Sequence, residues 1–197
     1  MTADAPSPPD PFAFDALVGK ANAGINGKRG PAPVHLWNPP FCGDIDMRIA
    51  RDGTWFYNKS PIGRLPMVQL FSSILRRDGE SYFLVTPVEK VGIQVEDAPF
   101  LAIRMRQEQG ALIFTTNVEE DVSAGADHPL RFEQEPGGGM KPYVLVRDNL
   151  WALVKRALFY DLVGLGETRE VDGVAVFGVS SQGTFFAMAP AAEIEAL

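Results

Sequence analysis

Side chains suited to binding a planar or anionic ligand are concentrated between His35 and Phe100. Two tryptophans and a tyrosine there offer flat surfaces on which a purine or another planar group could stack. Arginines in the same stretch can direct guanidinium groups at a phosphate or a carboxylate. The candidate ligand-binding residues are Trp37, Asp46, Arg48, Trp55, Tyr57, Arg64 and Lys90. If these side chains converge, they would form a polar pocket with aromatic walls.

The same residues allow a purely structural interpretation. The aromatic rings could belong to the core, and the arginines could pair with Asp44 and Asp46. These two aspartates occupy alternate positions of an expected strand, so they share a face and could instead bind a ribose hydroxyl or a magnesium ion. Two solvated strand carboxylates are the simpler interpretation of that pair.

Catalytic and cofactor motifs are incomplete in this chain. Cys42 and His35 could form a nucleophilic pair, but such a pair needs an activated thiol and an orienting third group. The glycines of Gly164-Leu165-Gly166 are followed by Arg169 where a dinucleotide-binding motif has its third glycine. We therefore expect no cofactor and no metal site. A hydrolase that uses Cys42 or the aspartate pair is kept as an alternative hypothesis.

The charge of the chain argues against nucleic acid as a partner. The 197 residues carry a net charge of -7, with lysine and arginine scattered along the sequence. Non-specific binding to DNA or RNA depends on clustered cations, so no nucleic-acid polymer is expected. No run approaches the roughly 18 apolar residues of a spanning helix, and no secretion signal is visible. We expect no membrane insertion and a cytoplasmic location.

Apolar periodicity predicts an α+β fold. Asp44–Ala50 alternates apolar and polar residues as a strand does, and Asp52-Gly53 predicts a tight hairpin that returns through Thr54–Asn58. The expected helices are Pro11–Gly24, Leu65–Arg77 and Asn149–Val163. The other expected strands are Tyr82–Thr86, Val91–Val95, Leu101–Arg106, Ala111–Thr116, Tyr143–Arg147, Val174–Val179 and Thr184–Met188, with a loop at 117–129.

The chain is expected to comprise a tail, short helix and connector at 1–32, an α+β unit at 33–88 and a second α+β unit at 89–197. The second unit would be a mostly antiparallel sheet with one helix. An Arg-Asp dipeptide closes a strand in both units, at Arg51-Asp52 and at Arg147-Asp148. An apolar helix follows each dipeptide, which predicts a duplicated strand–helix–strand core.

Several short strings occur together over about residues 35–190. They are Trp37-x-Pro39, Cys42–Ile49, Asp52-Gly53-x-Trp55-x-Tyr57, Pro61-Ile62-x-Arg64, Leu84–Lys90, Val95–Phe100 and Tyr143–Asp148. This combination resembles the bacterial domain-of-unknown-function family 1285. The resemblance implies a duplicated core of two packed units, the second superficially like a pleckstrin-homology domain. It also implies a nucleotide-type ligand at the interface of the units and a role in signal transduction.

The leading hypothesis is a cytoplasmic, non-enzymatic protein that binds a small, nucleotide-like anionic ligand. Trp37, Trp55 and Tyr57 would wall the pocket, while Arg48 and Arg64 would hold the anion. The second hypothesis is a protein-interaction adaptor, because an exposed edge of the antiparallel sheet could accept a strand from a protein partner.

Overall fold

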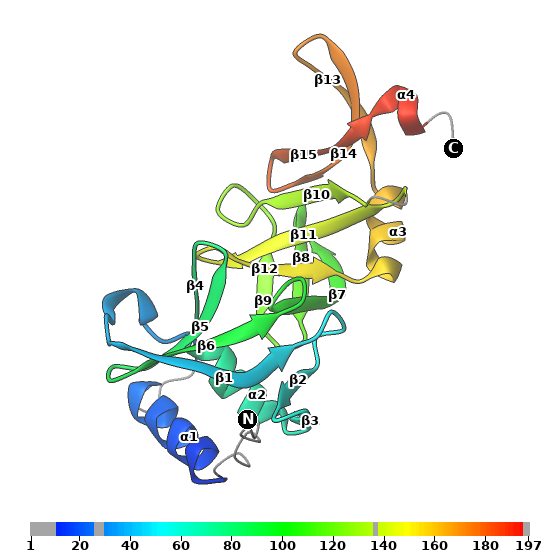
Figure 1. Cartoon of the computed structure of the whole chain (residues 1–197). Helices are drawn as coiled ribbons and strands as arrows, with labels where there is room; N and C mark the ends of the chain where they lie inside the picture. The colour runs from blue at the N-terminus through cyan, green and yellow to red at the C-terminus, as the bar shows by residue number, and fades with distance from the viewer. Residues whose placement is uncertain (1–10, 26–29, 136–137, 195–197) are drawn as a thin grey trace. The chain divides into compact units, whose positions relative to one another are not determined.

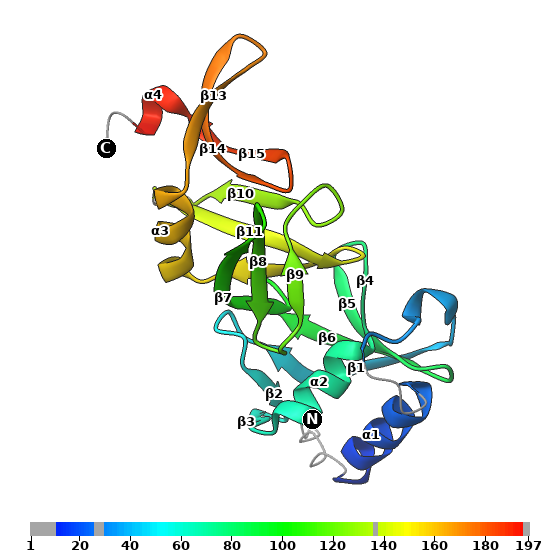
Figure 2. The same cartoon turned by 180° about the vertical axis from the view of Figure 1, so that it is seen from behind.

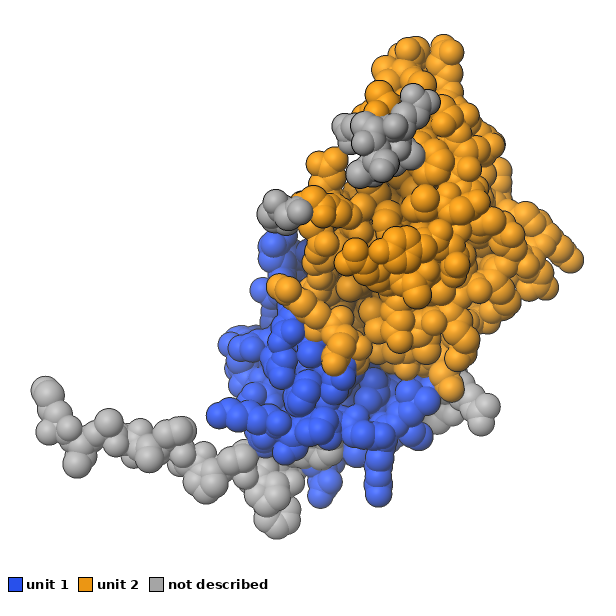
Figure 3. Space-filling view, turned by 90° about the vertical axis from the view of Figure 1, so that its right-hand side faces the viewer, with its two compact units in different colours: residues 1–50, 54–96 blue, residues 51–53, 97–197 orange. Residues whose placement is uncertain are grey.

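A computed structural model describes residues 11–25, 30–135 and 138–194, so the expected N-terminal tail lies outside the described residues. The chain divides into two compact units, coloured separately in Figure 3. Unit 1 comprises the residues up to 50 and 54–96, and unit 2 comprises 51–53 and the residues from 97 onward. The division expected from the sequence falls after residue 88. The strand Lys90–Val95 belongs to unit 1 because it pairs with two other strands there.

Unit 1 contains a six-stranded sheet with the order β3-β2-β1-β6-β5-β4 (Figure 1). Its strands are β1 (Phe41–Ile49), β2 (Trp55–Tyr57), β3 (Ser60–Pro61), β4 (Leu75–Asp78), β5 (Ser81–Val85) and β6 (Lys90–Val95). The strands β1 and β6 run parallel, and every other neighbouring pair is antiparallel. The helical segments of this unit are α1 (Pro11–Ile25), the short 3-10 helix η1 (Val34–Leu36) and α2 (Leu65–Ser73).

Unit 2 contains a second six-stranded sheet, with the order β10-β11-β12-β7-β8-β9 (Figure 2). Its strands are β7 (Phe100–Glu108), β8 (Ala111–Thr116), β9 (Asp121–Ser123), β10 (Leu130–Gln134), β11 (Met140–Arg147) and β12 (Leu150–Val154). The chain continues through α3 (Arg156–Gly164), a three-stranded sheet of β13 (Glu167–Val171), β14 (Val174–Ser181) and β15 (Thr184–Pro190), and α4 (Ala191–Ile194). No helix in the described ranges is long and apolar enough to cross a membrane.

The two six-stranded sheets have the same topology. In each sheet, the first three strands are consecutive neighbours that run from the centre to one edge. The next three run from the other edge back to the centre, where the sixth strand lies parallel beside the first. The expected α+β fold with a duplicated core is confirmed. The two Arg-Asp dipeptides, however, do not occupy equivalent positions in the two sheets. Arg51-Asp52 follows the first strand of its sheet, whereas Arg147-Asp148 follows the fifth. The helices also differ, since α2 precedes the fourth strand of its sheet and α3 follows the sixth.

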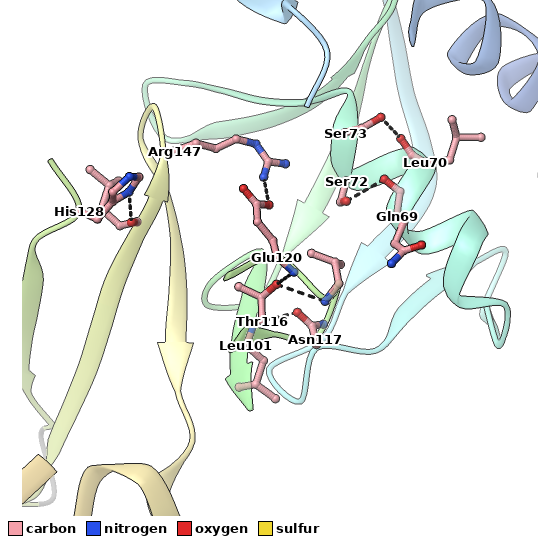
Figure 4. A network of polar contacts seen from close by, with 12 residues as sticks. Gln69, Leu70, Ser72, Ser73, Leu101, Thr116, Asn117, Glu120, His128 and Arg147 are labelled. Atoms are coloured by element: carbon pink, nitrogen blue, oxygen red, sulfur yellow. Dashed lines mark hydrogen bonds and ion pairs between the residues drawn. The ribbon is translucent and has the colours of Figure 1, made fainter. Parts of the chain in front are cut away.

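The helix expected at Leu65–Arg77 ends at Ser73. The hydroxyls of Ser72 and Ser73 donate hydrogen bonds to carbonyl oxygens one turn earlier, at 2.8 and 2.6 Å (Figure 4). Such bonds compete with the main-chain ladder of a helix. The next residues, Leu75–Asp78, pair with β5 instead. This part of the prediction is wrong because these residues contain no signal for the partner strand, whose hydrogen bonds satisfy their main-chain groups.

The helix expected at Asn149–Val163 begins at Arg156 for the same reason. Leu150–Val154 pairs with β11 on one side and with β7 on the other, which satisfies its main-chain groups as a central strand. The loop expected at 117–129 contains the short strand β9.

Each sheet buries one of its faces. In unit 1 this face carries Met47, Ile49 and Trp55, which are at most 1% exposed. The ring of Trp55 stacks on Phe71 of α2, with 6.4 Å between centroids and 18° between planes. The alternation expected in β1 is confirmed, because its buried and accessible residues follow the two-residue period of a strand.

The three-stranded sheet of unit 2 is held to the six-stranded sheet through the tip of the β14–β15 hairpin. The buried hydroxyl of Ser181 donates to the carbonyl oxygen of Ala124 at 2.6 Å and accepts from the N–H of Leu112 at 2.8 Å. The N–H of Gln182 donates to the carbonyl oxygen of Gly110 at 2.9 Å. These bonds fasten the hairpin to β8 and to the segment that follows β9.

Candidate functional site

The loop Arg51–Gly53 decides where the expected ligand-binding side chains of β1 and β2 point. It is one residue longer than the tight turn predicted from the sequence, and its glycine has a φ of 81°. In this register Arg48 lies opposite Phe56. A two-residue turn would have set Arg48 opposite Tyr57. Because successive strand residues alternate between faces, one loop residue decides the face that each side chain of β2 occupies.

The observed register separates the candidate residues onto two faces of the sheet. Trp55 and Tyr57 lie on the face packed against α2, whereas Asp46 and Arg48 lie on the opposite, outer face. Trp55 is 1% exposed, and its indole N–H has no hydrogen-bond partner within the described residues, so the ring is surrounded by packing atoms. A single pocket cannot present both Trp55 and Arg48 to one ligand.

The cations of the outer face already have partners. Arg48 forms an ion pair with Glu96, and its guanidinium lies 4.4 Å from the ring centroid of Phe56. Lys90 lies on the same face by strand alternation, and its ammonium nitrogen is 3.4 Å from a carboxylate oxygen of Asp78. A ligand anion would have to displace these carboxylates, so the outer face is a weak candidate for anion binding.

Trp37 and Arg64 lie outside the sheet. Gly24 of α1 rests against the ring of Trp37, and a Cβ on this glycine would come within 3.0 Å of Trp37 Cη2. The Trp37 side chain therefore helps to hold α1 in place. Arg64 is exposed immediately before α2 and makes no capping hydrogen bond.

Arg76 was expected near the end of a helix, and the structure places it on β4. Its guanidinium donates to the carbonyl oxygens of Val34 at 3.1 Å and Trp37 at 2.8 Å, and to the carboxylate of Asp78 at 2.9 Å. Burial opposes ionisation of Asp78, yet hydrogen bonds from Arg76 and Lys90 bring its pKa below the ordinary value. This cluster ties η1 to the sheet and leaves little charge for a ligand.

Unit 2 contains a hollow of about 290 Å³ beside β11, β12 and α3. Its lining combines apolar, aromatic and charged residues. The apolar side chains are Met140, Pro142, Leu153 and Val154, the aromatic ones are Phe159 and Tyr160, and the charged ones are Glu135, Lys141 and Arg156. Apolar walls with a few polar groups are typical of small-molecule sites, whose volumes begin near about 300 Å³.

Arg156 is a cation at this hollow. Among the described residues, no carboxylate lies within ion-pair distance of its guanidinium. Arg156 lies one helical turn before Tyr160 on α3, and its Nε donates to the Tyr160 hydroxyl at 3.1 Å. This hydrogen bond raises the pKa of Arg156 further above its ordinary value, so the guanidinium is charged at every physiological pH. Its remaining N–H groups can donate hydrogen bonds to a phosphate or a carboxylate.

Lys141 is compensated by two acids. Its ammonium nitrogen lies 2.8 Å from a carboxylate oxygen of Asp97 and 3.5 Å from one of Glu135. The hydrogen bond with Asp97 raises the pKa of Lys141, and the same carboxylate accepts the Tyr143 hydroxyl at 2.7 Å. Burial, followed by the Asp97 carboxylate, raises the pKa of Tyr143 as well. Arg156 is therefore the cation of the hollow without a directly paired carboxylate, and Glu135 acts on it only beyond ion-pair distance.

The residues that line this hollow are not among the candidates expected from the sequence. Arg156, Phe159 and Tyr160 fall within a segment expected to be one long helix, where an arginine followed by aromatic residues is common surface composition. The four-residue spacing of Arg156 and Tyr160 places both on one face of a helix. This spacing is the sequence feature that could have indicated the pair. The strands that complete the hollow could not be assigned to it from the sequence.

Another polar cluster of unit 2 is satisfied internally (Figure 4). Asn117 accepts from the N–H of Leu101 at 3.0 Å and donates to the carbonyl oxygen of Gly53 at 3.1 Å. Thr116 accepts two main-chain N–H groups, and Glu120 pairs with Arg147. These bonds hold loops in place.

The residues considered for metal binding and nucleophilic catalysis do not form a larger cluster. Within the described ranges, no group of three or more His, Cys, Asp and Glu side chains could hold a metal ion. Cys42 is exposed, and its sulfur lies 3.5 Å from the carbonyl oxygen of Pro40.

Comparison with known families accounts for most of the chain. A domain of unknown function, the N-terminal domain of DUF1285, matches residues 32–98. The C-terminal domain of the DUF1285 protein of unknown function matches residues 99–188. The chain belongs to the DUF1285 family. The boundary between the two family domains lies close to the division between unit 1 and unit 2.

Two solved DUF1285 structures resemble this one. A crystal structure of a DUF1285 family protein from Silicibacter pomeroyi DSS-3 is 52% identical, with a TM-score of 0.80, and the match covers 91% of this chain and 97% of that chain. A DUF1285 family protein from Shewanella baltica OS155 is 29% identical, with a TM-score of 0.50 over 60% of this chain and 90% of that one. No match was found among curated proteins.

Proposed function

We propose that this DUF1285 protein binds a small anionic ligand with a planar or apolar part in the hollow of unit 2. The observation that carries the proposal is Arg156, a guanidinium without a carboxylate partner among the described residues, at the rim of an apolar and aromatic hollow. The ligand class is the one expected from the sequence, but Arg156, Phe159 and Tyr160 replace the residues of unit 1 as its contacts. A site at the interface of the units, which the family resemblance implies, stays a prediction.

Charge supports an anionic ligand at this position. The whole chain has a net charge of -7, so an anion is repelled by most of the surface and needs a local cation. Arg156 supplies this cation, while Lys141 is offset by Asp97 and Glu135. A guanidinium that already donates to the Tyr160 hydroxyl is also partly held in place, which lowers the entropy cost of binding.

The size and lining of the hollow limit the ligand further. A volume of about 290 Å³ suits an aromatic acid, or one base with its sugar and phosphate as in a nucleoside monophosphate, better than a dinucleotide. The rings of Phe159 and Tyr160 lie 6.3 Å apart with 42° between their planes, and either could contact a planar group.

The position of the hollow supports a regulatory role. The helix α3 contacts both β7 and β14, so a ligand held by α3 touches the element that joins the two sheets of unit 2. Ligand binding that favours one placement of α3 would shift the population of the conformations of β14.

Isothermal titration calorimetry with adenosine monophosphate and with benzoate tests the proposal, because both probes combine a planar ring with an anion. Arg156→Gln should weaken binding about 10- to 100-fold, since hydrogen bonds to a charged group contribute about 1.5–3 kcal/mol. Tyr160→Phe keeps the ring and should have a smaller effect. The matched control is Arg104→Gln, which removes an exposed arginine elsewhere in unit 2.

Two results would overturn the proposal. One is the absence of binding of either probe at millimolar concentration. The other is binding that Arg156→Gln weakens no more than Arg104→Gln does, which would assign the ligand to another part of the chain.

A further inference from the structure

The outer strand of the three-stranded sheet presents an open edge. The sheet has the order β13-β14-β15, and all five residues of β13 are exposed. Figures 1 and 2 both show the β13–β14 hairpin extending beyond the six-stranded sheet of the same unit. The pairing of β13 with β14 is regular, without a bulge, and β13 contains no proline. Bulges and prolines commonly block such edges, and β13 has neither, so its main-chain groups are open to pairing with a strand of complementary charge.

The hairpin turn determines which main-chain groups point outward. Asp172 and Gly173 have φ values of 51° and 78°, as in a two-residue hairpin loop that closes on Val171 and Val174. In an antiparallel ladder the hydrogen-bonded pairs alternate along the strand. The N–H and C=O groups of Thr168 and Glu170 are therefore directed away from β14, toward the open edge.

Side-chain charge selects one way for two copies of β13 to pair. In a two-fold symmetric antiparallel pair, the axis passes beside one residue, which then faces itself. An axis at Arg169 or at Glu170 would oppose like charges. An axis at Thr168 opposes two hydroxyls and sets each Glu167 against the Arg169 of the other copy. Opposite charges and Thr–Thr pairs both stabilise neighbouring strands, whereas like charges destabilise them.

The two charged side chains are already arranged on one face of β13. The carboxylate of Glu167 lies 2.7 Å from the Arg169 guanidinium and accepts a hydrogen bond from Ser180, also at 2.7 Å. This hydrogen bond lowers the pKa of Glu167, so the carboxylate is charged at neutral pH. Arg169 lies 5.1 Å from the ring centroid of Phe185. A second copy would complete a cluster of four alternating charges from side chains that need little rearrangement.

We propose that a second copy of this chain pairs with it through antiparallel β13 strands, with the two-fold axis at Thr168. The two three-stranded sheets then form one continuous six-stranded sheet. The exposed Leu165, just before β13, and the exposed Val171, at its end, come to the same end of the pair. Edge pairing satisfies the outward N–H and C=O groups of both copies.

Sedimentation equilibrium of the full chain tests this proposal. A contact of two short strands is small, so the dimer is expected at protein concentrations of about 100 μM and above. Arg169→Glu sets carboxylate against carboxylate twice in each dimer, and Glu167→Arg sets guanidinium against guanidinium twice. Each single substitution should weaken dimerisation about tenfold or more. Glu170→Lys, which lies opposite Gly166 in this register, is the matched control.

Charge reversal provides the decisive arm of the experiment. The double variant Glu167→Arg/Arg169→Glu restores both pairs and should dimerise as the original chain does. An equimolar mixture of the two single variants should form a mixed dimer, although neither associates alone. Thr168→Pro removes an outward N–H without removing a bond to β14, so it should abolish the dimer while the far-ultraviolet circular dichroism is retained.

Three results would overturn the proposal. The first is a chain that stays monomeric at all concentrations. The second is a dimer that neither single substitution weakens more than Glu170→Lys does. The third is a failure of both the double variant and the mixture to restore association when the variants are folded.

Discussion

Replacing Ser181 by Ala removes the hydroxyl that holds the β14–β15 hairpin to the rest of unit 2. This side chain is 1% exposed. Its hydroxyl donates to the carbonyl oxygen of Ala124 at 2.6 Å and accepts from the N–H of Leu112 at 2.8 Å. Both partners are themselves at most 1% exposed, so water cannot replace the hydroxyl. Alanine fits the space but leaves two buried main-chain groups without a hydrogen bond.

The expected loss follows from these two groups. A buried donor or acceptor left unpaired costs about 1–3 kcal/mol, so the loss of two hydrogen bonds should lower the free energy of unfolding of unit 2 by about 2–6 kcal/mol. With a urea dependence of about 2 kcal/mol per molar for a domain of this size, the midpoint should fall by about 1–3 M. Urea unfolding of the full chain, followed by circular dichroism and tryptophan fluorescence, measures this shift.

The neighbouring Ser180 is the matched control. Its hydroxyl donates to the exposed carboxylate of Glu167, which water can solvate when the hydroxyl is lost. Ser180→Ala should therefore cost at most about 1 kcal/mol. If Ser181→Ala destabilised the protein no more than Ser180→Ala does, the reasoning from buried, doubly bonded groups would be refuted.

Three further changes follow from the packing and charges of both units. In Gly178→Ala, the new Cβ would lie 2.2 Å from the main-chain oxygen of Phe186, so we expect a loss of about 1–3 kcal/mol or more in thermal or urea unfolding. The pKa of Asp121 lies below its ordinary value, mainly because its carboxylate accepts a hydrogen bond from Thr115. The ionised carboxylate stabilises the folded chain at pH above its ordinary pKa of 3.8, and this contribution is lost as the pH falls through the lowered pKa. Asp121→Asn should therefore reduce the dependence of the unfolding free energy on acid pH. Trp37→Ala should speed hydrogen exchange in α1, because the ring that packs against this helix is removed.

Two of these changes have a control within the same chain. Gly164→Ala adds a Cβ with no heavy atom nearby, and it should be close to neutral. For Asp121→Asn, an acid dependence equal to that of the original chain would contradict the argument. Leu36→Ala removes a side chain that is 73% exposed and should not change the exchange of α1. Equal effects in a variant and its control would contradict the corresponding argument.

Local patterns determined much of unit 1 correctly. The alternation in β1 is visible in the sequence because a two-residue period needs no knowledge of the partner strand. Turn residues marked the connection of β1 to β2, and the combination of short strings indicated the DUF1285 family. These signals are short in range, so they are complete within a few residues of the chain.

The face of the sheet on which each candidate ligand-binding side chain lies depended on contacts between residues distant in the sequence. The tight turn predicted at Asp52-Gly53 and the observed loop Arg51–Gly53 differ by one residue, which moves Trp55 to the face opposite Arg48. The sequence contains glycine and aspartate suitable for either loop. Burial of Trp55 against Phe71 favours the observed register, and that contact exists only in the folded sheet.

The segments Leu75–Arg77 and Leu150–Val154 show the same limit. Each was expected to be helical, and each lies in a strand because a neighbouring strand supplied its hydrogen-bond partners. The hollow near Arg156 likewise depends on the packing of α3 beside β11 and β12. The sequence by itself determined the family, the fold class and the period of the strands, since these depend on neighbouring residues. Only the tertiary structure decided pairing, register and the site, because these depend on which distant main-chain and side-chain groups the fold brings into contact.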